Sequence, residues 1–443
     1  MDGALLNEAG ERVERRRLLM QLIQESHPEK TGALLLLSGF EREREQFYQD
    51  SSFEYFVGLQ EPAVMLYQLI GQEATLFMPN YAIDRSVWLP KSFDEEQLAS
   101  LGIKAIELMG QKIQGYATGP VFEKTSLENL IKTVKAVCDA GESIFTPVSS
   151  VTVECQWVLQ QLCQFVPALK KQLINIDPLV AQLRRTKSQH ELEHLYMAAE
   201  ITTIAQEAAA GVIRKGALEQ DVQAAIEFVF TESGATKAFA SVVGSGVNST
   251  ILHYVDNKAP LPDNGLVVVD IGASINHYCS DVTRTYPVAG KFNKRQKQVY
   301  QDVLDCQSYI ADLAKPGMYL RNKQKPEKCL NSLAHAFLQK RGYHVEKEFP
   351  HGIGHFVGLD VHDVGDVTQP LAPGDIITIE PGIYLRDEQL GVRIEDVYWI
   401  VKEGAVCLTE QVPKEIEEIE QFMRSSELNG FYDNHKVTGP DEH

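Results

Sequence analysis

The order of hydrophobic and polar positions in the first third of the chain predicts short helices and strands in alternation. Residues 11–26 place Leu19 and Ile23 on one face of an amphipathic helix. Residues 32–38 form an apolar run, which is typical of a strand buried on both faces. Further elements are expected at 64–71, 74–79, 95–101, 104–108, 127–137, 143–148 and 151–165. Together these elements predict a small α/β domain.

The rest of the chain repeats one plan. Long helices are predicted at 188–212 and 294–314, and a lysine and a glycine follow each of them closely. Shorter helices are expected at 221–230 and 329–340, and strands at 240–244, 251–255, 266–271 and 281–286. The repetition predicts two related halves.

A domain boundary is predicted at 175–178, where proline ends regular structure before a new helix begins. A chain of 443 residues is also too long for one ordinary core. We therefore expect an α+β protein with an N-terminal α/β domain at 1–176, a second domain at 177–427 and a polar C-terminal tail at 428–443.

Composition and charge exclude several classes of function. The chain is 44% hydrophobic and 23% charged, with a net charge of −19, so a general affinity for nucleic acid is not expected. No apolar run is long enough to cross a membrane. Seven cysteines without a Cys-x-x-Cys pair indicate a reducing compartment, and we expect a cytoplasmic protein without membrane partners.

Four carboxylates lie where two predicted hairpins would bring them together. Asp270 ends one apolar run and Asp281 begins the next, and a chain reversal at 275–276 would make them direct cross-strand partners. Glu380 and Glu395 repeat this arrangement around a midpoint at 387–388. A single acid at the end of a strand most often pairs with an arginine, but two symmetric pairs need a stronger explanation.

The stretch 351–363 contains three histidines, and three glycines lie between them. Glycine-rich backbone is expected where another group must approach closely. A polar loop with clustered histidines is the alternative interpretation. Four carboxylates beside a histidine cannot all be ionised at close range without a cation, so the pattern favours a pair of divalent metal ions.

These residues resemble the pita-bread metallopeptidases, which include aminopeptidase P, prolidase and methionine aminopeptidase. The resemblance rests on Asp270 and Asp281 with ten residues between them, His351-Gly-Ile-Gly-His355, Glu380-Pro-Gly-Ile-Tyr and Arg393-Ile-Glu395. It implies a pita-bread catalytic domain with a pseudo-two-fold repeat. Residues 51–62 are similar to the N-terminal domain of aminopeptidase P and prolidases, so the first domain is expected to be creatinase N-terminal-like.

The resemblance also implies the roles of individual residues. Asp281 and Glu395 would bridge two divalent metal ions, Mn²⁺ first and Co²⁺, Zn²⁺ or Fe²⁺ as alternatives. The full set of implied metal ligands is Asp270, Asp281, His355, Glu380 and Glu395. His253 and His362 would contact substrate, Glu380 would transfer a proton, and Arg393 and Thr283 would position the acids. His351 lies near the site, and Trp88 matches a tryptophan that reaches a neighbouring subunit in oligomeric relatives.

The implied reaction is hydrolysis of the Xaa-Pro bond at the N-terminus of peptides, as in aminopeptidase P. A prolidase specific for Xaa-Pro dipeptides is the first alternative. A non-catalytic peptide-binding module and a creatinase-type metal-free hydrolase are the others, and the five intact ligand positions argue against both. A homo-oligomer, dimer or tetramer, is expected by analogy with the family.

Overall fold

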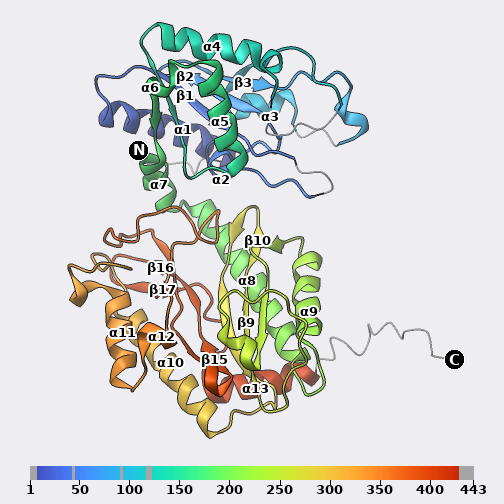
Figure 1. The fold of residues 1–443 in the computed structure, drawn as a ribbon, viewed down its shortest axis with the longest axis vertical. Helices are drawn as coiled ribbons and strands as arrows, with labels where there is room; N and C mark the ends of the chain where they lie inside the picture. The colour runs from blue at the N-terminus through green and yellow to red at the C-terminus, as the bar shows by residue number, and fades with distance from the viewer. Residues whose placement is uncertain (1–6, 42–44, 90–92, 116–121, 429–443) are drawn as a thin grey trace, which may run out of the picture. The chain divides into compact units, whose positions relative to one another are not determined.

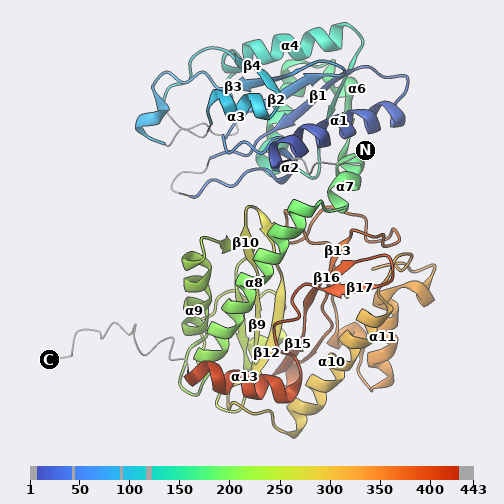
Figure 2. The same cartoon turned by 180° about the vertical axis from the view of Figure 1, so that it is seen from behind.

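The computed structural model describes residues 7–41, 45–89, 93–115 and 122–428 (Figures 1 and 2). The chain divides into two compact units, Met1–Arg184 and Arg185–His443. Beyond Leu428 the predicted polar tail lies outside the described residues.

The N-terminal unit is built on a six-stranded mixed sheet with the strand order β4-β3-β2-β1-β5-β6. The central strand β1 pairs antiparallel with β2 and parallel with β5. The predicted hairpin between β2 and β3 is confirmed by their antiparallel pairing. The strands are β1 (Gly32–Leu37), β2 (Met65–Leu69), β3 (Ala74–Met78), β4 (Ile103–Leu108), β5 (Ser143–Thr146) and β6 (Leu173–Asn175).

Helices cover β1 on both faces, as its uniform apolar sequence predicts. Ala33, Leu35 and Leu37 join a core formed with α4 and α5, while Leu34 and Leu36 are buried on the opposite face. Helix α2 contacts both β1 and α1. The helices of this unit are α1 (Glu8–Ser26), α2 (Ser51–Phe56), α3 (Glu95–Ser100), α4 (Glu128–Asp139), α5 (Val153–Phe165) and α6 (Leu169–Gln172), and α7 (Asp177–Arg185) ends at the division between the units.

The second unit begins with a helix pair packed on a β-hairpin. Helix α8 (Gln189–Val212) starts at the capping box of Ser188 and Glu191, and it packs against α9 (Glu219–Glu232). Helix α8 also contacts β9 and β12, the two long strands of the hairpin. The strands of this half are β7 (Thr236–Lys237), β8 (Val242–Ser245), β9 (Leu266–Ile271), β10 (Ala273–Ile275), β11 (Tyr278–Cys279) and β12 (Val282–Pro287).

The next half repeats this arrangement, which confirms the predicted α+β architecture. Helix α10 (Lys294–Leu313) packs against α11 (Leu330–Lys340) and contacts β13 and β14 of a second hairpin. In Figures 1 and 2, α8 and α9 lie on one side of the strands and α10 and α11 on the other. The remaining elements are α12 (Val345–Glu348), β13 (Ile376–Ile379), β14 (Gly382–Leu385), β15 (Leu390–Arg393), β16 (Asp396–Ile400), β17 (Ala405–Cys407) and α13 (Ile416–Leu428).

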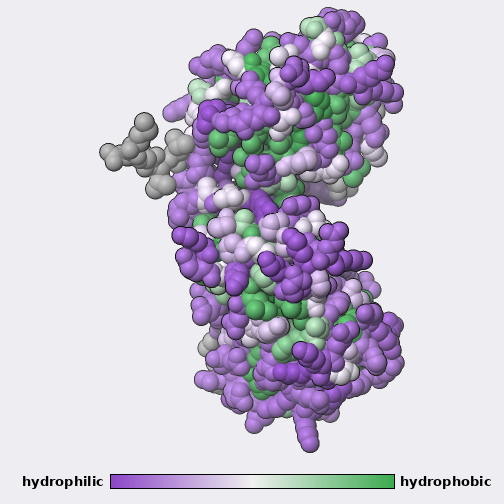
Figure 3. All heavy atoms as spheres, turned by 90° about the vertical axis from the view of Figure 1, so that its left-hand side faces the viewer, coloured by the Kyte–Doolittle hydropathy of each residue, from purple (hydrophilic) through white to green (hydrophobic). Residues whose placement is uncertain are grey.

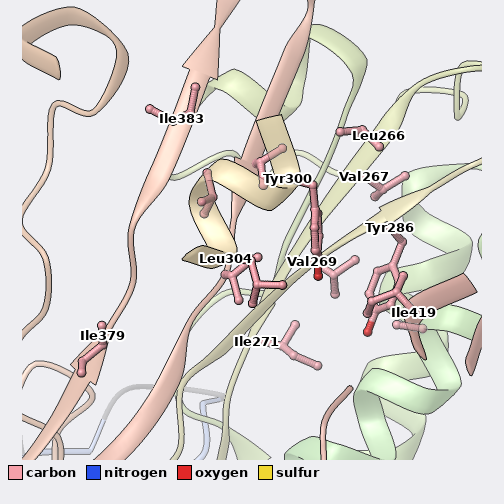
Figure 4. Close-up of a cluster of buried hydrophobic side chains, with 14 of the residues drawn as sticks. Leu266, Val267, Val269, Ile271, Tyr286, Tyr300, Leu304, Ile379, Ile383 and Ile419 are labelled. Carbon is pink, nitrogen blue, oxygen red and sulfur yellow. The ribbon is translucent and has the colours of Figure 1, made fainter. Parts of the chain in front are cut away.

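The core of this unit joins strands and helices from both halves. Figure 4 shows side chains of β9, β12 and α10 gathered in one cluster, including Val269, Tyr286 and Leu304. Burial of each such side chain stabilises the fold by about 1.5–3 kcal/mol. The hydroxyl of Tyr286 donates to Oε1 of Gln206 at 2.9 Å, so its polar end is also satisfied.

One expectation about strands is wrong. Residues 251–255 form a turn and loop after the 3₁₀ helix Gly246–Thr250, not a strand, and Ile251 and Val255 are exposed there. Local apolar content predicted a strand, but this segment leaves the sheet to line a cavity. The histidine stretch 351–363 is also irregular, apart from one bridge between Phe356 and Ile377.

Hydrophilic side chains predominate on the face shown in Figure 3, with hydrophobic residues in patches between them. None of the helices within the described ranges is long and apolar enough to cross a membrane.

Candidate active site

Asp270 and Asp281 lie on one hairpin, but their pairing differs from the prediction. The hairpin reverses at Asn276 and His277, which both have positive φ (49° and 70°), as in a two-residue primed turn. The ladder therefore pairs Asp270 with Thr283, and the predicted direct pairing with Asp281 is wrong. Because the pairing shifts by two residues, Asp281 keeps the same face and lies diagonal to Asp270.

Glu380 and Glu395 lie on the second hairpin in the predicted register. Ile379 pairs with Asp396 on one side of them, and Gly382 pairs with Arg393 on the other. The same register runs through the interruption at 380–381, so Glu380 faces Glu395.

Backbone contacts hold the two hairpins side by side. The amide of Glu395 donates to the carbonyl of Thr283 at 3.1 Å. The hydroxyl of Thr285 donates to the carbonyl of Arg393 at 2.9 Å. The acidic faces of the two hairpins are thereby fixed against each other.

The histidine stretch lies along β13 and supplies His355. The amide of Thr378 donates to the carbonyl of His355 at 2.9 Å. A Cβ at Gly354 would be 2.0 Å from the carbonyl oxygen of Thr378, so only glycine permits this approach. The close approach that the glycines predicted is therefore present.

The tautomer of His355 follows from its hydrogen bond. Its Nδ1 lies 3.0 Å from the carbonyl oxygen of Phe356, which can only accept, so Nδ1 carries the hydrogen. Its Nε2 then presents a lone pair, 3.4 Å from Oδ2 of Asp281 and 3.7 Å from Oε1 of Glu380. This orientation is that of a metal-ligating histidine.

Asp281, His355 and Glu395 form a cluster suited to a metal ion. Each offers one ligand atom, and the three atoms lie within 4.8 Å of one another. Oδ1 of Asp270 and Oδ1 of Asp281 are buried and have no hydrogen-bond partner. A buried carboxylate oxygen without a partner lowers the stability of the fold. Several carboxylates with one imidazole are ligands that suit a divalent cation, which would supply the missing partner.

The pKa shifts of the acids have the same cause. Burial raises the pKa of Asp281 well above its usual value, and the charges of Asp270 and Glu380 raise it further. Burial likewise raises the pKa of Glu395, together with the charges of Asp281 and Glu380. Burial also raises the pKa of Glu380, although His355 and Arg393 oppose this effect. Added positive charge would allow these acids to ionise together.

Arg393 positions the acidic residues through a buried hydrogen-bond network. Its Nη2 donates to Oδ2 of Asp270 at 2.6 Å and its Nε to the hydroxyl of Thr283 at 3.0 Å. That hydroxyl donates to Oε2 of Glu395 at 2.6 Å. The positioning roles expected of Arg393 and Thr283 agree with these contacts.

Tyr384 extends this network and was missed by sequence reasoning. Its hydroxyl accepts from Nη1 of Arg393 at 2.9 Å and lies 2.8 Å from Nε2 of His351. His351 places Nδ1 2.9 Å from the carbonyl oxygen of Gly352, so Nε2 is the acceptor of the Tyr384 hydroxyl. Burial and the charge of Arg393 lower the pKa of His351 to about 3, which keeps it neutral. Register was the available signal for Tyr384, since it shares the hairpin with Arg393.

Two further histidines reach the same space. His253 and His362 line a cavity of about 570 Å³ together with the four acids and His355. The ring centroids of His355 and His362 are 4.0 Å apart. Burial, then the charges of His355 and His253, lower the pKa of His362 to about 4, so it is a neutral hydrogen-bonding group. The expected site residues of the second unit are therefore brought together.

Trp88 lies in the N-terminal unit and is 59% exposed. Its expected contact with a neighbouring subunit stays a prediction.

Known proteins share this arrangement. The profile of metallopeptidase family M24 matches residues 193–402. Human Xaa-Pro aminopeptidase 3 is 30% identical over 409 residues, which cover 85% of this chain and 76% of the human protein. The chain belongs to metallopeptidase family M24. Within this family it belongs to the pita-bread Xaa-Pro aminopeptidase group, and the protein is a metal-dependent hydrolase.

Other M24 relatives divide between two activities. The Xaa-Pro dipeptidase of Pyrococcus furiosus is 38% identical over 244 residues, covering 54% of this chain and 67% of that protein. The structure of aminopeptidase PepP from Pseudomonas aeruginosa superposes with a TM-score of 0.78 at 26% identity, covering 96% of this chain and 99% of that one. The fold is therefore that of the aminopeptidase P structures, which confirms the predicted pita-bread architecture.

Proposed function

We propose that this protein is an aminopeptidase P, which removes the first residue from peptides that carry proline in the second position. The observation that carries the proposal is the cluster of Asp281, His355 and Glu395 in the wall of the 570 Å³ cavity. Asp270 and Glu380 complete it from the adjoining hairpin strands.

Two divalent cations fit the donor atoms of the site. Asp281 and Glu395, which are both buried beside the other acids of the cluster, would hold these ions. Asp270, His355 and Glu380 would complete the coordination. We propose Mn²⁺ first, since four carboxylates and one imidazole suit this ion, with Co²⁺, Zn²⁺ and Fe²⁺ as alternatives. When bound, such ions supply an activated water and polarise the scissile carbonyl.

The surrounding residues supply the remaining chemistry. Glu380, whose pKa is raised chiefly by burial, would take up a proton during attack and return it to the departing nitrogen. His253 and His362 would donate hydrogen bonds to the oxyanion. Arg393 would hold Asp270 and, through Thr283, Glu395 in position.

The Xaa-Pro bond requires a dedicated site, because its nitrogen carries no hydrogen that a general peptidase can bind. A prolidase restricted to Xaa-Pro dipeptides is the second candidate. It is favoured by the 38% identity to a dipeptidase, which covers 54% of this chain, whereas the likeness to aminopeptidase PepP covers 96% of it.

Parallel cleavage assays test the proposal. With added Mn²⁺, a Xaa-Pro-Xaa tripeptide should lose its first residue rapidly, and Asp281→Asn should abolish this cleavage and the bound metal. Cleavage confined to a Xaa-Pro dipeptide would indicate a prolidase. An Asp281→Asn variant as active as the wild type would contradict the two-metal site.

The cellular setting is a separate proposal. All seven cysteines are free, which supports a reducing compartment such as the cytoplasm. A homo-oligomer is proposed by analogy with the family, and the exposed Trp88 is the residue to examine at its interface.

A further inference from the structure

Arg321 is a charged residue of the cavity that the reaction described above does not use. It follows α10 in the chain, and its amide donates to the carbonyl of Val367 at 3.0 Å. Both residues line the cavity. The backbone of Arg321 is thus fixed at the cavity wall, while its side chain is exposed.

No acidic side chain within the described ranges pairs with the Arg321 guanidinium. The other arginine of the cavity, Arg393, is already bonded to Asp270, Thr283 and Tyr384. The segment 363–379, which also borders the site, contains no lysine or arginine. Arg321 is therefore the cavity arginine available to meet a negative charge on a ligand.

Gly352 leaves space for the guanidinium. A Cβ at this position would lie 2.4 Å from Nη2 of Arg321, and the φ of Gly352 is not positive. The guanidinium therefore occupies the space that a side chain at residue 352 would take. The carbonyl of Gly352 accepts from His351, whose Nδ1 is 3.5 Å from Oε2 of Glu380. Arg321 thus lies beside the backbone segment that carries His351.

The cavity wall consequently carries both kinds of charge. Four carboxylates line it, and so does Arg321, with which none of the described acids pairs. A short peptide also carries both charges, with an ammonium group at its N-terminus and a carboxylate at its C-terminus. An aminopeptidase must place the ammonium end beside the scissile bond, and a C-terminal carboxylate that remains inside the cavity then needs a positive partner.

We propose that Arg321 binds the C-terminal carboxylate of short substrates, one or two residues beyond the scissile bond. Each residue spans about 3.5 Å, and dipeptides and tripeptides are the short substrates on which this contact is to be tested. A guanidinium binds a carboxylate through paired hydrogen bonds. The inference rests on the proposed Xaa-Pro aminopeptidase function and assigns its preferred substrates as short peptides with free C-termini.

The test compares one tripeptide, Ala-Pro-Ala, as its free acid and as its C-terminal amide. The wild-type enzyme should show a KM for the acid lower by roughly two- to fivefold, the range of a partly exposed charged pair. Arg321→Gln should remove this difference by raising the KM of the acid, with the kinetics of the amide unchanged. Arg321→Lys should retain part of the preference, because it keeps the charge but not the planar pair of donors.

The controls separate the possible failures. Arg295→Gln removes a cation that pairs with Glu388 outside the cavity, and it should leave the acid-to-amide ratio as in the wild type. An unchanged ratio in Arg321→Gln would overturn the inference. The inference would also be overturned if Arg321→Gln raised the KM only of Ala-Pro-Asp-amide, because the carboxylate of that peptide is on a side chain and not at the C-terminus. If the wild type cleaves neither tripeptide, the proposed function itself fails, whereas cleavage of both without a preference removes only the role of Arg321.

Discussion

Glu395 and Asp396 are adjacent in sequence, and both are buried, yet their surroundings differ completely. Asp396 accepts from Arg284 at 2.7 Å and from Lys414 at 2.9 Å, and Thr409 and Gln307 add two further hydrogen bonds. Burial alone would raise the pKa of Asp396, but the charges of Arg284 and Lys414 lower it below its usual value. Asp396 is a fully compensated structural acid.

Glu395 points to the opposite side of the chain and meets other acids. Its side chain accepts a hydrogen bond from the hydroxyl of Thr283, while burial and the charges of Asp281 and Glu380 raise its pKa. The difference teaches that burial of a carboxylate does not by itself mark a functional site. A functional site is indicated instead by buried carboxylates that lack enough positive charge nearby, because a bound cation can supply that charge.

The largest expected effect comes from neutralising each of the two neighbours. Glu395→Gln should lower kcat/KM by about 10³-fold or more, because it removes a carboxylate that is proposed to hold the metal ions. The metal-free fold should be at least as stable as the wild type, since a repulsive charge is lost. Asp396→Asn should instead destabilise the protein by about 3–5 kcal/mol, because Arg284 and Lys414 lose their buried partner.

Denaturant unfolding of the metal-free proteins and metal analysis of the purified proteins measure both effects. A Glu395→Gln protein that retains two metal ions, or an Asp396→Asn protein as stable as the wild type, would erase the distinction between the two acids.

A smaller effect is expected from replacing the arginines that contact these acids, Arg393 in the acidic cluster and Arg284 beside Asp396. Arg393→Lys keeps the charge but cannot reproduce bonds to Asp270, Thr283 and Tyr384 together. Activity and metal affinity should fall by about 10–100-fold, with the fold retained. Arg284→Lys is the matched control: it should lower the free energy of unfolding more than it lowers metal affinity. Equal metal affinities for Arg393→Lys and the wild type would argue against its positioning role.

The smallest expected effect is on the pH dependence of stability, which has one sign for Asp281 and Glu395 and the opposite sign for Asp396. In the metal-free protein, the raised pKa values of Asp281 and Glu395 mean that the folded state binds more protons than the unfolded state. Stability should therefore fall as pH rises from the unfolded pKa of about 4 through the raised values. The lowered pKa of Asp396 acts oppositely, and its contribution is lost as pH falls through the folded value.

Melting temperatures with EDTA and with Mn²⁺ between about pH 5 and about pH 8 test this prediction. Because metal binding displaces protons, the stabilisation by Mn²⁺ should grow with pH. At a pH where the ion is present at 100 times its Kd, the stabilisation should be about 2.7 kcal/mol. A stabilisation that is independent of pH would mean that the acids carry no excess protons.

Sequence reasoning predicted which acids share a face, and it predicted the pairing of the second hairpin but not that of the first. The two-residue period of a strand is enough to orient Glu380 and Glu395, and the symmetric spacing placed their hairpin in register. The first hairpin differed because its turn uses Asn276 and His277, and positive φ at a histidine has no strong local signal.

Long-range contacts explain the other differences. Nothing in the local sequence shows that 251–255 leaves the sheet to place His253 at the cavity, since its apolar content resembles a strand. Arg321 reaches the cavity through contacts with Gly352 and Val367, so its position appears only in the folded protein. Tyr384 could have been found from the register of the hairpin that it shares with Arg393.

The union of two hairpins in one site also affects how the protein folds. Thr283 and Glu395 meet across 112 residues of chain, so the cluster cannot form until both halves have closed on each other. Metal capture during refolding should therefore report the docking of the halves and not the formation of either hairpin. A ribosome-bound chain would acquire its ions only after the last ligand, Glu395, had been synthesised and docked.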